Sequence, residues 1–182
     1  MIETLISSKT RIKLLLKFFL NSRTTAYLRS LESQFGESTN GIRIELNRLE
    51  KAGMLRSFAQ GNKKFFQANT DHPLYHDIHN IVMKYVGLDQ VIANVIERLG
   101  EVKAVYLAGE FARGLDSDII DLILVGGINQ EYLMHLIDRA ESMVSRRIRY
   151  LIYDEQDAFN ATWQQKDPAP LLIWSQDNGM TA

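Results

Sequence analysis

The chain has 182 residues, of which 46% are hydrophobic and 24% are charged, as in an ordinary globular protein. This composition excludes a disordered, collagen-like or low-complexity chain. No stretch reaches the roughly 20 apolar residues of a membrane helix, because the longest candidate, residues 12–20, contains Lys13 and Lys17. The chain has no cysteine. Together with an N-terminus that lacks a signal-peptide pattern, this absence predicts a cytoplasmic protein without disulfides or a thiolate metal site.

Positive and negative charges are segregated along the chain. Residues 1–70 contain 12 Lys and Arg against 5 Asp and Glu, whereas residues 71–182 contain 9 against 17. A basic segment is typical of nucleic-acid binding, because Lys and Arg that contact phosphates release condensed counterions. Chance segregation of solvated charges would give the same counts, so charge alone does not decide the function.

Residues 1–70 are predicted to form three helices followed by a β-hairpin. The third helix shows the pattern well, because Ile42, Leu46 and Leu49 recur at helical spacing. The second is stopped by Gly36, and the hairpin turns at Gly61 between two arms of alternating apolar residues. The predicted elements are a helix from 9 to about 21, an extended piece at 24–27, helices at 28–35 and about 40–53, and strands at 54–60 and 63–68.

This element order is that of a winged helix-turn-helix domain. Residues 27–32 (Tyr-Leu-Arg-Ser-Leu-Glu) and 45–55 (Glu-Leu-Asn-Arg-Leu-Glu-Lys-Ala-Gly-Met-Leu) resemble the ArsR-type winged-helix transcriptional regulators. In that family the recognition helix ends in a similar Leu-x-x-Leu-x-x-x-Gly-Leu pattern that leads into the wing. The resemblance covers about residues 5–70 and implies a regulator that binds double-stranded DNA as a homodimer.

The outward side of the third helix supplies the candidate DNA contacts. Polar residues spaced 3, 4 and 4 apart form one stripe on that helix, and its N-terminal end would reach base edges in a major groove. The hairpin tip would reach a phosphate or the minor groove. The candidates are Thr39, Asn40, Arg43, Ile44, Asn47 and Lys51 on the helix, and Asn62, Lys63 and Lys64 on the hairpin. The alternative is that these residues are only the solvated face of a small domain.

Residues 71–100 are predicted to form two linker helices that meet at Gly87, the second at 88–99. We expect a dimer interface here, because winged-helix regulators generally pair two half-sites through isologous contacts. The first helix takes its apolar face from Leu74, Ile78, Ile81, Val82 and Tyr85.

Three histidines in the first linker helix raise the question of a metal site. His72, His76 and His79 are spaced i, i+4 and i+7, which is compatible with metal-ligand spacing on one helix face. Without a cysteine or a complete set of acidic ligands nearby, capping and packing are the favoured roles. The prediction is therefore that the protein has no metal and no cofactor.

Residues 101–182 are predicted to form a small α/β domain with a mixed sheet. The predicted order is a strand at 102–108, a loop at 109–114, a strand at 119–125, a helix at 130–144 and a strand at 148–153. The segments Ala-Arg-Gly at 112–114 and Asp-Leu-Ile-Leu-Val at 121–125 resemble the minimal nucleotidyltransferases of the polymerase-beta superfamily. That family's motif is Gly-Ser-x-Ala-Arg-Gly, a short spacer and Asp-x-Asp, with a third carboxylate on a later strand.

The resemblance implies metal-dependent chemistry, but the residues depart from the motif. Two carboxylates two positions apart on one strand would hold Mg²⁺ against a triphosphate. Asp121 matches the second, yet Ile119 occupies the first position and Asp118 is out of register by one residue. Glu110 replaces the serine, and residues 148–153 contain no acid. A bulged strand that lets Asp118 substitute is the alternative. We expect no enzymatic activity and a degenerate nucleotide pocket of Gly109, Glu110, Arg113, Asp118 and Asp121.

The sequence thus predicts an α+β protein with a winged helix-turn-helix at 1–70, linker or dimerisation helices at 71–100 and a nucleotidyltransferase-like domain at 101–182. The expected function is transcriptional regulation, with the last domain as scaffold, dimerisation module or binding place for a protein or small-molecule effector. Two alternatives stay open. One is an active nucleotidyltransferase of toxin-antitoxin type that modifies a protein or small molecule, and the other is a protein-interaction module.

Overall fold

The computed structural model describes residues 2–99, 101–163, 166, 168–177 and 179–180. The protein has the predicted α+β fold, and its chain divides into two compact units, Met1–Tyr85 (unit 1) and Val86–Ala182 (unit 2). The division falls inside the first of the two helices predicted as linkers. Among the described residues no helix has the length and hydropathy needed to cross a membrane.

Unit 1 contains the predicted three helices and hairpin. Ser8 and Ser38 cap the first and third of these helices, because each hydroxyl accepts the N–H of the residue three positions later. Gly36 ends the second in the left-handed region, with a φ of 62°. The elements are α1 (Ile2–Leu5), α2 (Lys9–Phe19), β1 (Ala26–Tyr27), α3 (Leu28–Phe35), α4 (Thr39–Lys51), β2 (Leu55–Gln60), β3 (Lys63–Ala68) and α5 (Tyr75–Val86).

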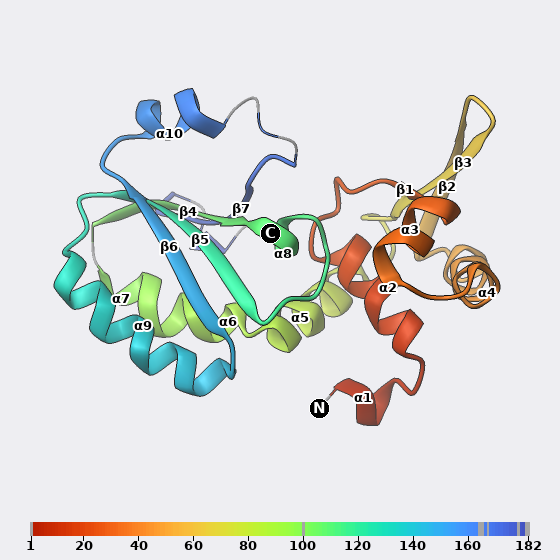
Figure 1. Ribbon diagram of the computed structural model, residues 1–182, viewed down its shortest axis with the longest axis horizontal. Coiled ribbons are helices and arrows are strands. Elements are labelled where there is room, and N and C mark those ends of the chain that lie inside the picture. Colours follow the sequence, from red (N-terminus) through yellow and green to blue (C-terminus); the bar gives the residue numbers. More distant parts are fainter. Residues whose placement is uncertain (1, 100, 164–165, 167, 178, 181–182) are drawn as a thin grey trace. The chain divides into compact units, whose positions relative to one another are not determined.

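Unit 1 also contains a three-stranded antiparallel sheet, formed by β1, β2 and β3. Its order is β1-β3-β2, with Ala26 opposite Phe66 and Leu55 opposite Ala68. These four side chains are buried, so this side of the sheet packs on the core and the alternate residues point outward. Figure 1 shows β2 and β3 as a hairpin that projects beyond the helices of unit 1, with β1 beside β3.

The apolar face predicted for α5 is divided between the core and the surface. Leu74 and Ile81, which belong to it, are 48% and 47% exposed. The buried residues are instead Tyr75, His79, Val82, Met83 and Val86. The helix has two apolar stripes, and the one that contains Tyr75 is buried because it packs on α2. The rings of Phe19 on α2 and Tyr75 on α5 lie 5.8 Å apart. Of the predicted face, only Val82 is fully inside.

The three histidines do not share one helix face. His72 precedes α5, and its Nδ1 accepts the backbone N–H of Leu74 at 3.1 Å. His76 is exposed, whereas His79 is buried with Nδ1 at 2.6 Å from the carbonyl oxygen of Phe19. The described residues contain no group of three or more His, Cys, Asp or Glu that could hold a metal ion. The observed roles are capping and packing.

Unit 2 is built on a mixed sheet, as predicted. Its strand order is β6-β5-β4-β7-β8. The strands β5 and β6 are parallel, and α9 makes the crossover connection that a parallel pair needs. The other neighbouring strands are antiparallel. The elements are α6 (Leu88–Val91), a π-helical turn (Ile92–Ile96), α7 (Glu97–Leu99), β4 (Val102–Ala108), α8 (Gly109–Ala112), β5 (Ile119–Gly126), α9 (Gln130–Val144), β6 (Arg147–Tyr153), α10 (Gln156–Trp163), β7 (Leu171–Ser175) and β8 (Gly179–Met180).

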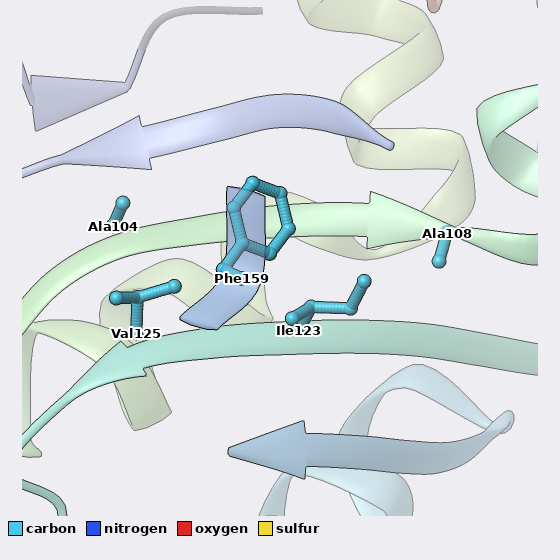
Figure 2. Close-up of a cluster of buried hydrophobic side chains, with 5 residues drawn as sticks. All are labelled: Ala104, Ala108, Ile123, Val125 and Phe159. Carbon is cyan, nitrogen blue, oxygen red and sulfur yellow. The ribbon is translucent and has the colours of Figure 1, made fainter. Parts of the chain in front are cut away.

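Helices cover both faces of this sheet. Figure 1 shows α6, α7 and α9 along one face and α10 on the other. In Figure 2, Phe159 of α10 lies over Ala104 and Ala108 of β4 and over Ile123 and Val125 of β5. These five residues are a buried cluster, so the α10 face of the sheet has a core of its own.

The buried histidine makes unit 1 sensitive to acid. Burial lowers the pKa of His79 below its ordinary value of 6.5, and the nearby His76 lowers it further, although the hydrogen bond to Phe19 opposes the shift. The unfolded chain therefore binds a proton more readily than the fold does. The stability contributed by neutral His79 is complete above pH 6.5 and is lost as the pH falls below that value through the lowered pKa.

We predict that His79→Asn removes this pH dependence, because Asn keeps a donor for the carbonyl of Phe19 but does not titrate. Urea unfolding followed by circular dichroism at about pH 7.5 and about pH 5.5 measures the change. The free energy of unfolding should fall more between these conditions in the parent protein than in the variant. Equal falls in the two proteins would contradict the assignment.

Candidate functional site

Unit 1 has a cleft of about 510 Å³ between α4 and the hairpin tip. Of the predicted DNA contacts, Arg43 and Asn47 line it from α4, and Asn62, Lys63 and Lys64 line it from the hairpin. The structure therefore brings five of the nine predicted residues to one concave surface. The other lining residues are Tyr27, Leu28, Arg29, Leu46 and Phe66.

The four remaining predicted residues lie on α4 outside this cleft. Asn40 and Lys51 are exposed, Thr39 is half-buried in the first turn, and Ile44 is 43% exposed. They belong to the outward face of the helix, as the spacing predicts, but they do not line the cleft. A duplex held by the cleft would have to extend along α4 to meet them.

Tyr27 and Arg29 are among the five cleft residues that the sequence did not predict. Both come from the junction of β1 and α3, which β1 brings beside β3: Tyr27 lies opposite Phe65. This pairing joins residues far apart in the sequence, and helical or strand spacing within one segment does not reveal it. Arg29 is exposed in the first turn of α3 and adds a cation to the cleft.

The cations of the cleft differ in what they already bind. Lys64 Nζ lies 2.7 Å from Glu50 Oε2, and the hydrogen bonds from Lys64 and Ser57 lower the pKa of Glu50. Lys63 Nζ instead sits 4.2 Å from the centre of the Tyr27 ring. Within the described part of the chain, Arg29, Arg43 and Lys63 have no acidic partner. They are the cations best placed to take phosphate oxygens.

A buried carboxylate fixes α4 against α2. Glu45 is 5% exposed, and its oxygens accept from Arg11 Nε at 2.8 Å, from Arg48 at 3.0 Å and from the Ser8 hydroxyl at 3.2 Å. Burial alone would raise the pKa of Glu45, but the hydrogen bonds from Arg11 and Ser8 and the positive charges outweigh it and lower that pKa. Because Ser8 also caps α2, the two helices are joined at one point.

Unit 2 has a groove of about 450 Å³ beside the strand that carries Asp121. Asp121 on β5 lies opposite Arg149 on β6, and Arg149 Nε is 2.7 Å from Asp121 Oδ1. The hydrogen bond and charge of Asp121 raise the pKa of Arg149. The groove is lined by Ala108, Gly109, Asp121, Leu122, Ile123, Arg149, Tyr150, Leu151 and Trp163.

These residues do not fit the metal ions that the nucleotidyltransferase resemblance implies. The strand that should supply a third carboxylate places a guanidinium beside Asp121, where it neutralises the one matching acid. Asp118 is exposed and precedes β5, and its carbonyl oxygen accepts the backbone N–H of Arg147 at 2.9 Å. No bulge therefore brings Asp118 into register between β5 and β6, which pair without a break from Ile119 onward.

Of the five residues of the predicted nucleotide pocket, two line the groove. Gly109 and Asp121 line the groove together, and the left-handed φ of Gly109, 63°, lets the Asp121 carboxylate lie against its Cα, where a β-carbon would collide with it. Glu110 and Arg113 pair with each other on α8 at 3.1 Å, outside the groove. Asp118 does not line the groove either.

Comparisons with known proteins give only distant similarities. No family model and no curated protein matches the chain. Among solved structures, the chain is similar to a "putative nucleotidyltransferase" from Sulfolobus solfataricus, with 21% identity over 57% of this chain and 91% of that one and a TM-score of 0.37. It is also similar to AF1382 from Archaeoglobus fulgidus, with 12% identity over 52% of this chain and 99% of that one and a TM-score of 0.37. Neither similarity assigns a family.

We predict that Glu45→Gln destabilises unit 1 by roughly 1–2 kcal/mol, because Arg11 and Arg48 lose a buried carboxylate but stay partly solvated. Urea unfolding near pH 7 measures this difference. It should shrink as the pH falls through and below the ordinary carboxyl pKa of 4.5, where the parent's Glu45 also loses its charge. A difference that persists unchanged in acid would mean that the carboxylate charge is not what stabilises the contact.

Proposed function

We propose that the protein is a transcriptional regulator that binds double-stranded DNA with unit 1. The observation that carries this proposal is the cleft between α4 and the hairpin, where Arg29, Arg43 and Lys63 have no acidic partner in the described part of the chain. Three such cations converging from three elements suit a polyanion better than a neutral ligand.

The shape of this surface supports a duplex as the polyanion. α4 is a helix of 13 residues with an exposed polar face, and a major groove about 12 Å wide admits such a helix. Its Asn47 offers an amide that can pair with adenine, and Arg43 offers a guanidinium that can take guanine or a phosphate. Asn62 and Lys63 at the hairpin tip would follow the neighbouring backbone.

We propose that unit 2 performs no nucleotidyl transfer. Catalysis of that class needs two or more carboxylates to hold metal ions, and the groove holds Asp121 bound to Arg149 instead. The groove is open and largely apolar beside this ion pair, so it is the place in unit 2 that an effector would enter.

We also propose that the protein acts as a homodimer through α5. A second apolar stripe is formed by Leu74, directly before the helix, and by Ile78, Ile81 and Tyr85 of α5. Leu74 and Ile81 are among the exposed large hydrophobic residues, and Ile78 and Tyr85 are half-buried. In an antiparallel two-fold pair, the stripes of the two copies would pack against each other along their whole length, with Ile78 of one copy against Ile81 of the other.

The charges beside the stripe support a second copy of this chain as the partner. Asp77 and Lys84 are both exposed, and they lie seven residues apart on the same flank of α5. Two antiparallel copies of the helix place Asp77 of each near Lys84 of the other. The stripe therefore complements itself both in hydrophobicity and in charge.

For DNA binding, we predict that Arg43→Glu weakens binding by roughly 2–4 kcal/mol, because repulsion replaces a phosphate or base contact. Fluorescence anisotropy with a duplex from upstream of the protein's own gene, and with a scrambled duplex, measures the affinity. Lys9→Glu is the control: it makes the same charge change at an exposed residue, the first of α2, outside the cleft.

The expected pattern is a parent protein that prefers the upstream duplex, with Lys9→Glu close to the parent and Arg43→Glu much weaker. Equal losses from the two reversals would mean that total charge, rather than the cleft, determines binding. No binding of either duplex by the parent at low salt would overturn the DNA proposal and favour a protein-interaction module.

For the dimer, we predict that Asp77→Lys and Lys84→Asp each weaken self-association, since each places like charges across the interface. The double variant with both changes should restore it, because the opposite charges face each other again. Sedimentation equilibrium gives the dissociation constants. A parent protein that is monomeric at all concentrations, or a double variant no better than the singles, would rule out this arrangement.

A further inference from the structure

The outer side of the sheet in unit 1 carries a row of three aromatic rings. Tyr27, Phe65 and Phe58 come from β1, β3 and β2 and lie directly opposite one another in the strand register. The rings of Tyr27 and Phe65 meet edge to face at 5.3 Å, and those of Phe65 and Phe58 stack at 5.8 Å with an interplanar angle of 14°. The row therefore spans the full width of the sheet.

This row is on the solvent side. Leu55, Phe66 and Ala68 are the buried residues of the hairpin, and alternation turns Phe58 and Phe65 the other way. Phe58 is 42% exposed although it is a large hydrophobic residue. It lies on β2, an edge strand of this sheet, and in the described part of the chain no second ring packs on it. One end of the row is thus open.

The surroundings of the row are basic. β1, β2 and β3 contain no acidic residue, whereas Lys63 and Arg56 both lie on the outer side. Lys63 Nζ closes the Tyr27 end of the row, 4.2 Å from the ring centre. Arg56, two residues from Phe58, forms an exposed ion pair with Asp71 that a phosphate can replace. Rings flanked by cations suit a ligand that has both flat faces and negative charge.

The row is continuous with the cleft. Tyr27 and Lys63 belong to both, since they line the cleft and also begin the aromatic row. A nucleic-acid strand that leaves the cleft past Lys63 would next meet Phe65 and Phe58. Base pairs inside a duplex are stacked on both faces and have none to offer these rings, but unpaired bases do.

We propose that this aromatic row binds unpaired bases of a single-stranded segment next to the duplex in the cleft. One base of this segment stacks on the open side of Phe58 and extends the Phe58–Phe65 stack. Lys63 binds the phosphate where the segment leaves the cleft, and Arg56 binds a phosphate near Phe58. This inference rests on the proposed DNA-binding function and narrows it to DNA in which a duplex adjoins unpaired bases. Because stacking on an aromatic ring does not distinguish one base from another, the row would add affinity without adding sequence specificity. Sequence specificity would come from α4.

The test compares the full-length protein's affinity for a blunt duplex and for the same duplex with a single-stranded extension of a few thymines, by fluorescence anisotropy. The extension should tighten binding about tenfold, as one stacked base does. Phe58→Leu keeps an apolar side chain without a flat face, so it should remove this gain and leave the blunt-duplex affinity unchanged. Phe58→Tyr retains the face and should retain the gain.

The outcomes separate this inference from the proposal on which it rests. Binding of the blunt duplex with no gain from the extension overturns the aromatic site alone, whereas failure to bind either probe overturns DNA binding as well. A gain that survives in Phe58→Leu also overturns the site, as does an equal loss on both probes. If Phe58→Leu does not fold, Phe58→Ile, which suits a strand better, replaces it under the same expectations.

Discussion

The buried carboxylate of Glu45 is the contact on which the proposed interface of unit 1 depends. Because a buried charge without partners is costly, α4 stays where Arg11, Arg48 and the Ser8 hydroxyl can reach that carboxylate. Together with the buried Ile42, Leu46 and Leu49, this contact fixes which side of α4 faces the core and which side faces out. Arg43 and Asn47 then lie across the cleft from the hairpin tip. An interaction inside unit 1 thus sets the geometry of a charged surface on its outside.

The two units use paired charges in opposite ways. In unit 1, Lys64 is bound to Glu50, but Arg29, Arg43 and Lys63 are left for an external anion. In unit 2, Asp121 is bound by Arg149, so the carboxylate that would hold a metal ion is already neutralised. Unit 1 therefore has positive charge available for a ligand. In unit 2, Arg149 neutralises Asp121, the carboxylate that matches the nucleotidyltransferase motif. This contrast is the basis of the two proposals that unit 1 binds DNA and that unit 2 performs no nucleotidyl transfer.

Local patterns in the sequence predicted most elements, because capping serines, stop glycines and apolar spacing act within a few residues. Long-range contacts determined what was missed. The buried stripe of α5 is chosen by Phe19, the arginine beside Asp121 depends on the register of β5 with β6, and Tyr27 joins the cleft only through β1. Glu45 was missed for a different reason: a charged helical residue is usually exposed, and its arginine partner on α2 is 34 positions away in the chain.

The salt dependence of duplex binding tests the central claim most directly, since counterion release reports how many phosphates are neutralised. With Arg29, Arg43 and Lys63 each contacting one phosphate, log K against log salt concentration should fall with a slope of about −3 for each protomer. Arg43→Glu should make that slope shallower by about 1. A slope near zero would contradict the claim that this cleft binds the DNA backbone. A slope that Arg43→Glu leaves unchanged would contradict a phosphate contact by Arg43 and leave it only the contact with a base.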